Sequence, residues 1–159
     1  MSWVVTGTGM LSSLGSTVAT SFEASCRGET GLAPLRAFDR ASYRVTNAYE
    51  VADRPPGEDR PRRATDWLCE VIRQAVAEAG LDPAGTGRVP VVVGTGLAEQ
   101  RSLELWWTGD TPLTVPDLDV SGAVAAAGLG PAYLFVNACS ASLFALAVGT
   151  DLLALGESD

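Results

Sequence analysis

The sequence predicts an α/β fold with a mostly parallel sheet, and two observations support this prediction. Three short runs of β-branched and aromatic residues show no polar–apolar alternation, which is typical of parallel strands covered on both faces. These runs are residues 3–6, 89–94 and 133–136. Helical patterns lie between and after the runs, and strands that alternate with helices indicate a parallel sheet.

Two amphipathic helices are expected before the last strand. Residues 17–27 form the shorter one, and residues 65–79 place apolar side chains at the spacing of one helical face. Gly80 follows the second pattern and is a typical helix end. The segment 53–63 between them is rich in proline and arginine, so we expect a solvated polar connection there.

The last predicted helix, residues 140–155, has apolar residues around its whole axis. Helices of this kind are usually buried on all sides. Few residues follow it in the sequence. We therefore expect a surface outside this chain to cover it.

Composition excludes several classes of function. The chain has 159 residues, is 47% hydrophobic, and carries a formal charge of -8 from 19 acidic and 11 basic residues. All the basic residues are arginine, and histidine is absent. An acidic chain without a basic stripe is a poor partner for nucleic acid. Without histidine, this chain supplies no imidazole to a catalytic triad or a zinc site.

We expect a reduced, cytoplasmic chain with no cofactor, no metal and no membrane partner. The N-terminus has no basic region typical of a signal peptide. The apolar stretch 138–156 is interrupted by polar residues and is short for a membrane span. Cys26, Cys69 and Cys139 are odd in number and widely spaced, which argues against a disulfide framework or a metal site.

Cys139 is the strongest candidate for chemistry. A predicted buried strand runs into small residues that open a long helix, and this places Cys139 at the helix N-terminus. Free N–H groups there favour negative charge, so they favour the thiolate and can stabilise an oxyanion. The alternative is that Cys139 is a small buried apolar residue. Cys26 and Cys69 follow no strand and are interpreted as packing residues.

Two glycine-rich turns follow predicted strands, at residues 7–9 and 94–96. The first begins a pattern like that of dinucleotide-binding loops, but Ser12 stands where the third glycine is needed. No acidic residue ends a second strand about twenty residues further on, as such folds require. We therefore interpret both glycine-rich segments as tight turns between the sheet and a helix.

Two further pairs of residues are given structural interpretations. Trp106 and Trp107 are expected to pack under a loop or at a subunit contact, with ligand stacking as the alternative. Asp117 and Asp119 have no partner arrangement that suggests acid–base catalysis. We expect them in a solvated loop.

Several segments, in order, resemble the β-ketoacyl-acyl-carrier-protein synthases of fatty-acid and polyketide synthesis. Each segment alone is weak, but together they cover almost the whole chain. The segments are Val4–Gly15, Gly28–Leu32, Arg62–Thr65, Val93–Gly96, Gly128–Pro131 and Val136–Ser140.

The resemblance implies one half of a thiolase-like fold, with a buried central helix after the nucleophile. Residues 1–159 would be a single domain, the N-terminal half, and the C-terminal half would be absent. Cys139 would accept the acyl group, and Leu97 would line the acyl pocket. The family's C-terminal half carries two catalytic histidines, a lysine and a glycine-rich loop. This sequence departs from the family pattern at Asn137, where threonine is usual, and at Ser142, where glycine is common.

The resemblance also implies partners. The first hypothesis is an acyltransferase that works with an acyl carrier protein and takes histidines from a C-terminal-half subunit or a second synthase chain. An oligomer is therefore expected. The second hypothesis is a non-catalytic ketosynthase-like subunit that binds or stabilises a synthase complex or a carrier protein. A nonfunctional gene fragment is a third and weaker alternative.

Overall fold

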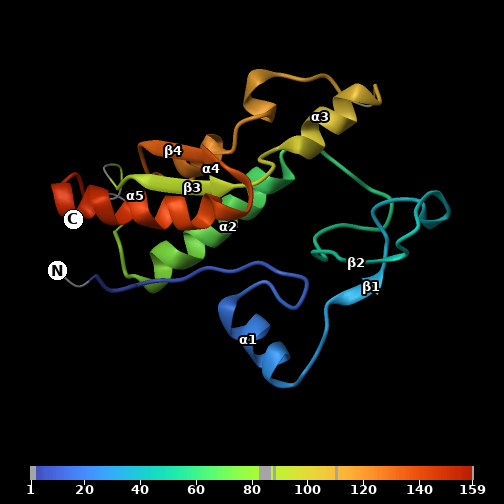
Figure 1. The fold of residues 1–159 in the computed structure, drawn as a ribbon, viewed down its shortest axis with the longest axis horizontal. Helices are drawn as coiled ribbons and strands as arrows, with labels where there is room; N and C mark the ends of the chain where they lie inside the picture. Colours follow the sequence, from blue (N-terminus) through green and yellow to red (C-terminus); the bar gives the residue numbers. More distant parts are fainter. Residues whose placement is uncertain (1–2, 83–86, 88, 110, 159) are drawn as a thin grey trace.

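The computed structural model describes residues 3–82, 87, 89–109 and 111–158. Helices and short strands alternate along the chain (Figure 1). In chain order the elements are α1 (Val18–Cys26), β1 (Leu32–Pro34), η1 (Arg40–Ser42), β2 (Asn47–Tyr49), α2 (Arg63–Glu78), β3 (Val91–Thr95), α3 (Gln100–Trp107), η3 (Val115–Asp117), α4 (Ser121–Ala126), β4 (Ala132–Val136), η4 (Ala138–Ser140) and α5 (Ala141–Leu155).

The core contains a parallel pair of strands, β3 and β4. Their register runs from Val91 opposite Ala132 to Thr95 opposite Val136, so both strands end at the same edge. Helix α5 runs along this pair and packs mainly against β3 (Figure 1). Helix α4 contacts both β4 and α2. The predicted α/β class and the parallel pairing are therefore confirmed, as are the helices at 17–27 and 65–79, with bounds that differ by one or two residues.

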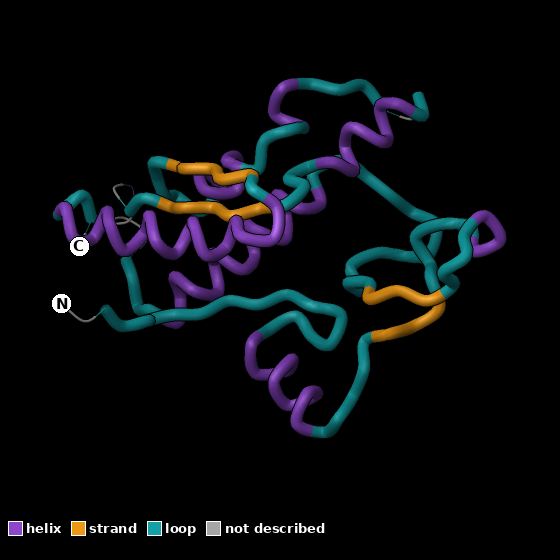
Figure 2. The backbone as a smooth tube through the Cα atoms, in the orientation of Figure 1, coloured by secondary structure: helices purple, strands orange, loops and turns teal. Residues whose placement is uncertain are grey.

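A second, antiparallel pair lies away from the core. Strands β1 and β2 pair from Leu32 opposite Tyr49 to Pro34 opposite Asn47. Together with η1 they form a lobe to one side of the β3–β4 layer (Figure 2). The side chain of Asp39 accepts a hydrogen bond from the Ala41 N–H at 3.1 Å and so caps η1. This lobe was not predicted from the sequence, because its strands have only three residues each.

The prediction of a strand at residues 3–6 is wrong for this structure. The segment is extended but makes no strand pairing among the described residues. Val4 and Val5 are each 81% exposed, although their side chains favour strands. Strand propensity acts only where a neighbouring edge is available, and the N-terminal segment lies along α2 instead (Figure 1).

The glycines at 7 and 9 are explained by this contact with α2 and not by tight turns. A Cβ atom at Gly7 would lie 2.1 Å from the Ala75 carbonyl oxygen, and one at Gly9 would lie 2.0 Å from the Val71 carbonyl oxygen. Only glycine allows the backbone to approach a helix this closely. The sequence-based interpretation of Gly7 and Gly9 as parts of a tight turn is therefore wrong.

Helix α5 is covered on one side only within this chain. Ala141 is buried against β3, but Leu143, Leu146 and Leu155 are 71%, 65% and 75% exposed. The expected burial on all sides is thus present only on the face toward β3 and β4. That a surface outside this chain covers the exposed leucines stays a prediction.

The stretch Ala138–Leu155 has a mean hydropathy of 1.7 over 18 residues. By length and composition it is just sufficient to cross a membrane, so the sequence-based judgement that it is too short and too polar was too strict. The core helices of soluble proteins have the same composition. Within the described part of the chain, α5 packs on β3 and β4 with one side only, and 6% of the stretch is buried.

Candidate functional site

Cys139 lies on a sharp turn between β4 and α5. Ala138, the residue before it, has a φ of 54°, a left-handed conformation that residues with a Cβ atom rarely adopt. The turn is closed by the Ala141 N–H, which donates to the Ala138 carbonyl, and by the Ser140 hydroxyl, which donates to the Asn137 carbonyl at 3.0 Å. This geometry leaves the Cys139 side chain exposed. The alternative of a buried packing cysteine is therefore not what the structure shows.

The first turn of α5 is pressed against β3 at Gly94. A Cβ atom there would lie 2.3 Å from the Ala141 carbonyl oxygen, so any larger residue would push the helix away. Gly94 therefore fixes the N-terminus of α5, and with it Cys139, at the carboxyl edge of the strands. Because β3 and β4 are parallel and end together, the turn containing Leu97 leaves the sheet at this same edge.

The start of α5 is suited to negative charge. The side chain of its N-cap residue, Ser140, accepts no hydrogen bond from the N–H groups of the first turn. The free N–H groups of a first turn carry a partial positive charge. Asn137, directly before the turn, has a buried Oδ1 atom that accepts no hydrogen bond within the described part of the chain. The free N–H groups of the first turn, and not the Asn137 oxygen, are the groups that can donate to an oxyanion formed beside Cys139.

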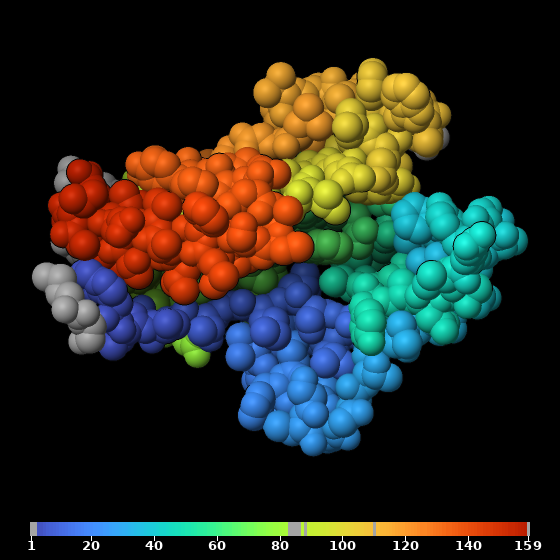
Figure 3. Space-filling model, viewed as in Figure 1, coloured from blue at the N-terminus to red at the C-terminus, as the bar shows by residue number. Residues whose placement is uncertain are grey.

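An open cavity of about 1040 Å³ lies next to this edge. Leu97 and Val136, which follow and end the two parallel strands, belong to its wall, and they are 70% and 58% exposed. The rest of the apolar wall comes from α3, from the lobe with β1 and β2, and from the residue that follows η3. Its members are Phe38, Tyr43, Leu103, Trp106, Trp107 and Leu118. In the space-filling view the surface is recessed between the segment of α3 and this lobe (Figure 3).

Trp106 and Trp107 stand next to each other on this wall. Their ring centroids are 6.3 Å apart at an interplanar angle of 66°, and Trp107 is 80% exposed. Of the two structural interpretations of these tryptophans, packing under a loop does not fit Trp107, because its side chain is exposed. The structure brings both indoles to the cavity that Leu97 lines. The role of Leu97 in binding an acyl group remains a prediction.

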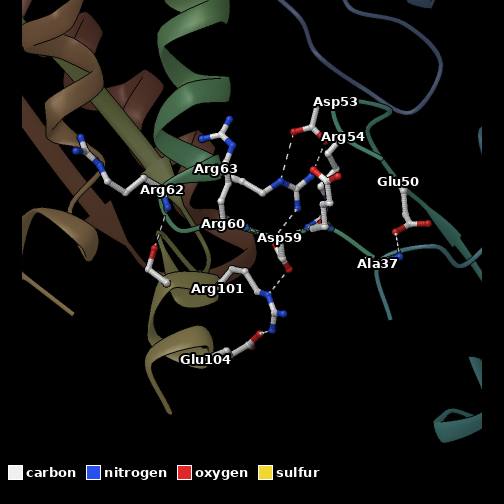
Figure 4. Close-up of polar contacts among 12 residues, drawn as sticks. Ala37, Glu50, Asp53, Arg54, Asp59, Arg60, Arg62, Arg63, Arg101 and Glu104 are labelled. Atoms are coloured by element: carbon white, nitrogen blue, oxygen red, sulfur yellow. Dashed lines mark hydrogen bonds and ion pairs between the residues drawn. The ribbon is translucent and has the colours of Figure 1, made fainter. Parts of the chain in front are cut away.

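The segment 53–63 is held by ion pairs to both α2 and α3 (Figure 4). Asp59 lies between Arg54, at 2.5 Å, and Arg101, at 2.6 Å. Partial burial opposes the charge on Asp59, but the hydrogen bond from Arg101 and the neighbouring guanidinium groups hold its pKa below the ordinary value. The expected solvated connection is therefore an anchored loop.

The neighbouring carboxylate Asp53 is held in the same way by α2. It accepts hydrogen bonds from Arg63 at 2.8 Å and from the indole N–H of Trp67 at 2.8 Å. Burial opposes the charge, but these bonds outweigh it and lower the pKa of Asp53. The guanidinium of Arg63 also stacks 4.5 Å from the Trp67 ring. These contacts tie the N-terminus of α2 to the start of the segment 53–63.

The remaining candidates have structural roles. Asp117 accepts hydrogen bonds from the Thr114 hydroxyl and N–H, which lower its pKa, and it caps η3. Asp119 accepts from Ser121 and has its pKa lowered in the same way at the start of α4. Asp117 completes the capping box of η3, and Asp119 accepts from the first residue of α4, so both have a structural role in the loop. Among the described residues, no three cysteine or acidic side chains gather to hold a metal ion.

The other two cysteines lie apart from this edge. Cys26 ends α1 and is exposed, and Cys69 lies within α2. The Cys69 sulfur accepts a hydrogen bond from Arg73 at 3.4 Å. Neither residue lines the cavity beside Leu97.

Sequence reasoning missed Ala138, Glu99 and Ser102. Ala138 gives no signal, because alanine rarely adopts a positive φ and nothing in the sequence marks this exception. Glu99 and Ser102 are 2% and 1% exposed, although acidic and hydroxyl side chains are usually at the surface. Only the position of Glu99 three residues after the glycine-rich turn at 94–96 could have drawn attention to it.

Comparisons with known proteins agree with this geometry. The sequence profile of the β-ketoacyl synthase N-terminal domain matches residues 3–159. The chain belongs to the β-ketoacyl synthase family. It is 28% identical to 3-oxoacyl-[acyl-carrier-protein] synthase 2 of Coxiella burnetii (strain RSA 493 / Nine Mile phase I). It is 29% identical to the ketoacyl synthase alpha subunit of the tetracenomycin polyketide synthase of Streptomyces glaucescens.

These matches include 98% of this chain but 43% of each relative, so the chain spans less than half of their length. Among solved structures, it is similar to the ishigamide ketosynthase/chain length factor, with a TM-score of 0.76 and 25% identity over 98% of this chain and 45% of that one. A ketosynthase from a complex with a type II polyketide synthase acyl-carrier protein has a TM-score of 0.71 at 20% identity, covering 98% of this chain and 43% of that chain. The predicted thiolase-like ketosynthase fold is thereby confirmed.

Proposed function

We propose that this chain is the nucleophile-bearing part of a β-ketoacyl synthase and that Cys139 accepts an acyl group from an acyl carrier protein. The observation that carries the proposal is the exposed Cys139 on the strained turn between β4 and α5, at the same edge as Leu97. Membership of the β-ketoacyl synthase family supports the same chemistry.

In the acylation step, the Cys139 thiolate attacks the carbonyl carbon of the carrier thioester. A carbon–sulfur bond forms, and the carbonyl electrons move to oxygen, where free N–H groups at the start of α5 stabilise the oxyanion. The oxyanion then collapses, the bond to the carrier sulfur breaks, and the carrier thiolate leaves and takes up a proton. The product is an acyl thioester on Cys139.

The second step is decarboxylative condensation. A malonyl thioester loses CO₂, and the resulting carbanion attacks the acyl-Cys139 carbonyl and releases the Cys139 thiolate. We assign promotion of the decarboxylation to histidines of a partner chain, since this chain contains none. Residues 1–159 are accordingly proposed to act as one N-terminal half, without condensation activity alone.

Two partners follow from this proposal. The first is an acyl carrier protein, and a solved ketosynthase of the same fold is described in complex with one. The second is a C-terminal-half subunit or a second synthase chain that covers α5. The exposed leucines of α5 support this second partner.

The test is intact-mass spectrometry after incubation of the purified chain with an acyl-carrier thioester, alone and with a ketosynthase C-terminal half. We expect one acyl adduct per chain, lost in Cys139→Ala but kept in Cys26→Ala and Cys69→Ala. The last two variants are matched controls, because Cys26 is also exposed and Cys69 is partly exposed. An adduct that survives in Cys139→Ala would refute the assignment of the nucleophile.

A second function is suggested by the exposed leucines of α5, which offer a surface for a partner and no chemistry. The chain would then be a non-catalytic subunit that stabilises a synthase complex or binds a carrier protein. This alternative predicts a complex whose dissociation constant is the same for the wild type and Cys139→Ala, with no acyl adduct in either. Isothermal titration of each protein with a C-terminal half and with a carrier protein separates the two functions.

A further inference from the structure

The buried carboxylate of Glu99 joins the loop after β3 to the start of α2. Glu99 is 2% exposed, and its Oε1 atom accepts hydrogen bonds from the Thr65 N–H and the Thr65 hydroxyl, both at 2.5 Å. Thr65 is itself 4% exposed. Acidic side chains are rarely buried unless they are paired in this way, so the contact between two residues 34 positions apart calls for a reason.

Part of the reason lies in α2. Thr65 belongs to its first turn, whose N–H groups have no acceptor within the helix. The N-cap residue, Arg62, has a φ of 63° and gives no side-chain cap. Glu99 therefore supplies the cap from another element. Ser102, 1% exposed, adds a second contact by accepting a hydrogen bond from the Arg62 N–H at 3.0 Å.

The other part lies in the cavity wall. Glu99 is two residues after Leu97 and is the N-cap residue of α3, and Ala98 between them has a φ of 47°. The Ala98 N–H donates to the Thr95 hydroxyl at 2.9 Å, and the Gln100 N–H donates to the Leu97 carbonyl at 3.1 Å. The loop is thus fixed to β3 at its start and to α2 at Glu99. Leu97 projects from the part between these two anchors.

We propose that Glu99 is a positioning residue that holds Leu97 and the start of α3 in place, and thereby sets the length of apolar chain accepted beside Cys139. Glu99 acts through the backbone of the loop and does not itself touch the acyl group. The part of this proposal that concerns acyl groups rests on the proposed function. The part that concerns the position of Leu97 and the start of α3 does not.

The test uses residues 1–159 with Cys26→Ser and Cys69→Ser, so that Cys139 is the only thiol in the sequence. The second-order rate constants of Cys139 with N-ethylmaleimide and N-octylmaleimide are measured, and their ratio reports how an apolar tail fits beside the thiol. Hydrogen–deuterium exchange of residues 96–103 is followed in parallel. Neither measurement needs enzymatic activity.

Three variants and one control are compared. Glu99→Ala removes both hydrogen bonds and is expected to change the octyl-to-ethyl ratio about tenfold, a typical effect of a remodelled apolar pocket. Glu99→Gln keeps the accepting Oε1 and should restore the wild-type ratio. Thr65→Val keeps the shape of Thr65 but lacks the hydroxyl, and should change the ratio in the direction of Glu99→Ala. Glu70→Ala, an exposed carboxylate deletion on α2, is the matched control.

The proposal is overturned if Glu99→Ala has the wild-type ratio of rate constants and the wild-type hydrogen–deuterium exchange. It is also overturned if the ratio in Glu99→Gln differs from the wild-type ratio as much as the ratio in Glu99→Ala does. If Glu99→Ala does not fold, Thr65→Val decides: a shifted ratio supports the proposal and a wild-type ratio overturns it. Acylation of the same variants is measured separately. A changed maleimide ratio without acylation of the wild type would refute the proposed function and leave the positioning role standing.

Discussion

At the scale of single residues, the strained conformation of Ala138 controls the presentation of Cys139. A residue with a Cβ atom is destabilised in the left-handed region by about 1–2 kcal/mol relative to glycine. The chain accepts this strain where the turn must reverse direction between β4 and α5. Strain of this kind is often found at functional sites, which fits the exposed position of Cys139.

Replacing Ala138 by glycine is therefore expected to raise the free energy of unfolding by about 1 kcal/mol. The measurement is urea denaturation followed by circular dichroism. Ala77→Gly is the matched control, because Ala77 is an exposed residue in the last turn of α2, and the same change should lower the free energy of unfolding by up to about 1 kcal/mol. Equal losses in both variants would show that the φ of Ala138 does not govern the stability of the turn.

A second residue-scale prediction concerns Glu78 and pH. Hydrogen bonds from the Thr8 hydroxyl and then the Thr8 N–H lower the pKa of Glu78 below its ordinary value. Because the folded pKa is lower than the unfolded one, the contact stabilises the N-terminal segment at neutral pH. This stabilisation is lost as the pH falls through the pKa of Glu78 in the folded state.

Amide exchange measured by NMR is expected to show loss of protection at Thr8 on acidification below the ordinary glutamate range. The Met10 N–H, which donates to the uncharged Gln74 side chain, is an internal reference. In Glu78→Gln the Thr8 protection should no longer depend on pH. An unchanged pH dependence in that variant would assign the effect to another group.

At the scale of elements, the packing of β3 on α5 depends on the absence of a side chain at one position. Gly94→Ala is expected to lower the free energy of unfolding by about 2 kcal/mol, because the new Cβ would overlap the backbone of Ala141. It should also change the rate at which Cys139 reacts with iodoacetamide, since the first turn of α5 must move.

Gly96→Ala is the control for this prediction. Gly96 follows the same strand and has a φ outside the left-handed region, and a Cβ atom added there would meet nothing within 4 Å beyond its chain neighbours. Thermal denaturation of both variants is the measurement. If the two variants lose the same stability, close packing of β3 on α5 is not what requires Gly94.

At the scale of the whole molecule, the exposed apolar side of α5 dominates the behaviour of the chain. Leu143 and Leu146 present large apolar side chains to solvent on the helix that follows Cys139. An apolar patch of this kind favours association. The matching surface is proposed to belong to a C-terminal half.

The double substitution Leu143→Ser and Leu146→Ser is expected to reduce self-association of the chain, measured by sedimentation velocity. It should weaken binding to a C-terminal half, and it should change the free energy of unfolding by less than about 1 kcal/mol, because both side chains are already exposed. Val4→Ser with Val5→Ser removes apolar surface at the N-terminal segment and serves as control. Equal loss of association in the two double variants would show that α5 is not the associating surface.

The sequence by itself determined the α/β class, the strands at β3 and β4, and helices α1, α2 and α5. It also pointed to Cys139. Each of these features depends on a local pattern, either hydrophobic periodicity or a strand followed by small residues. A single segment of the sequence contains such a pattern in full. The family resemblance extended this to Leu97, whose role in acyl binding stays a prediction.

Only the tertiary structure decided the remaining features. Residues 3–6 have the composition of a strand, but pairing needs an available edge, and the segment lies against α2 instead. The burial of Glu99 depends on Thr65, 34 residues away, and the cavity joins α3 to a lobe that precedes α2. Contacts between distant segments leave no periodic trace in the sequence. They determine the surroundings of Cys139, which the sequence could place on the chain but not in space.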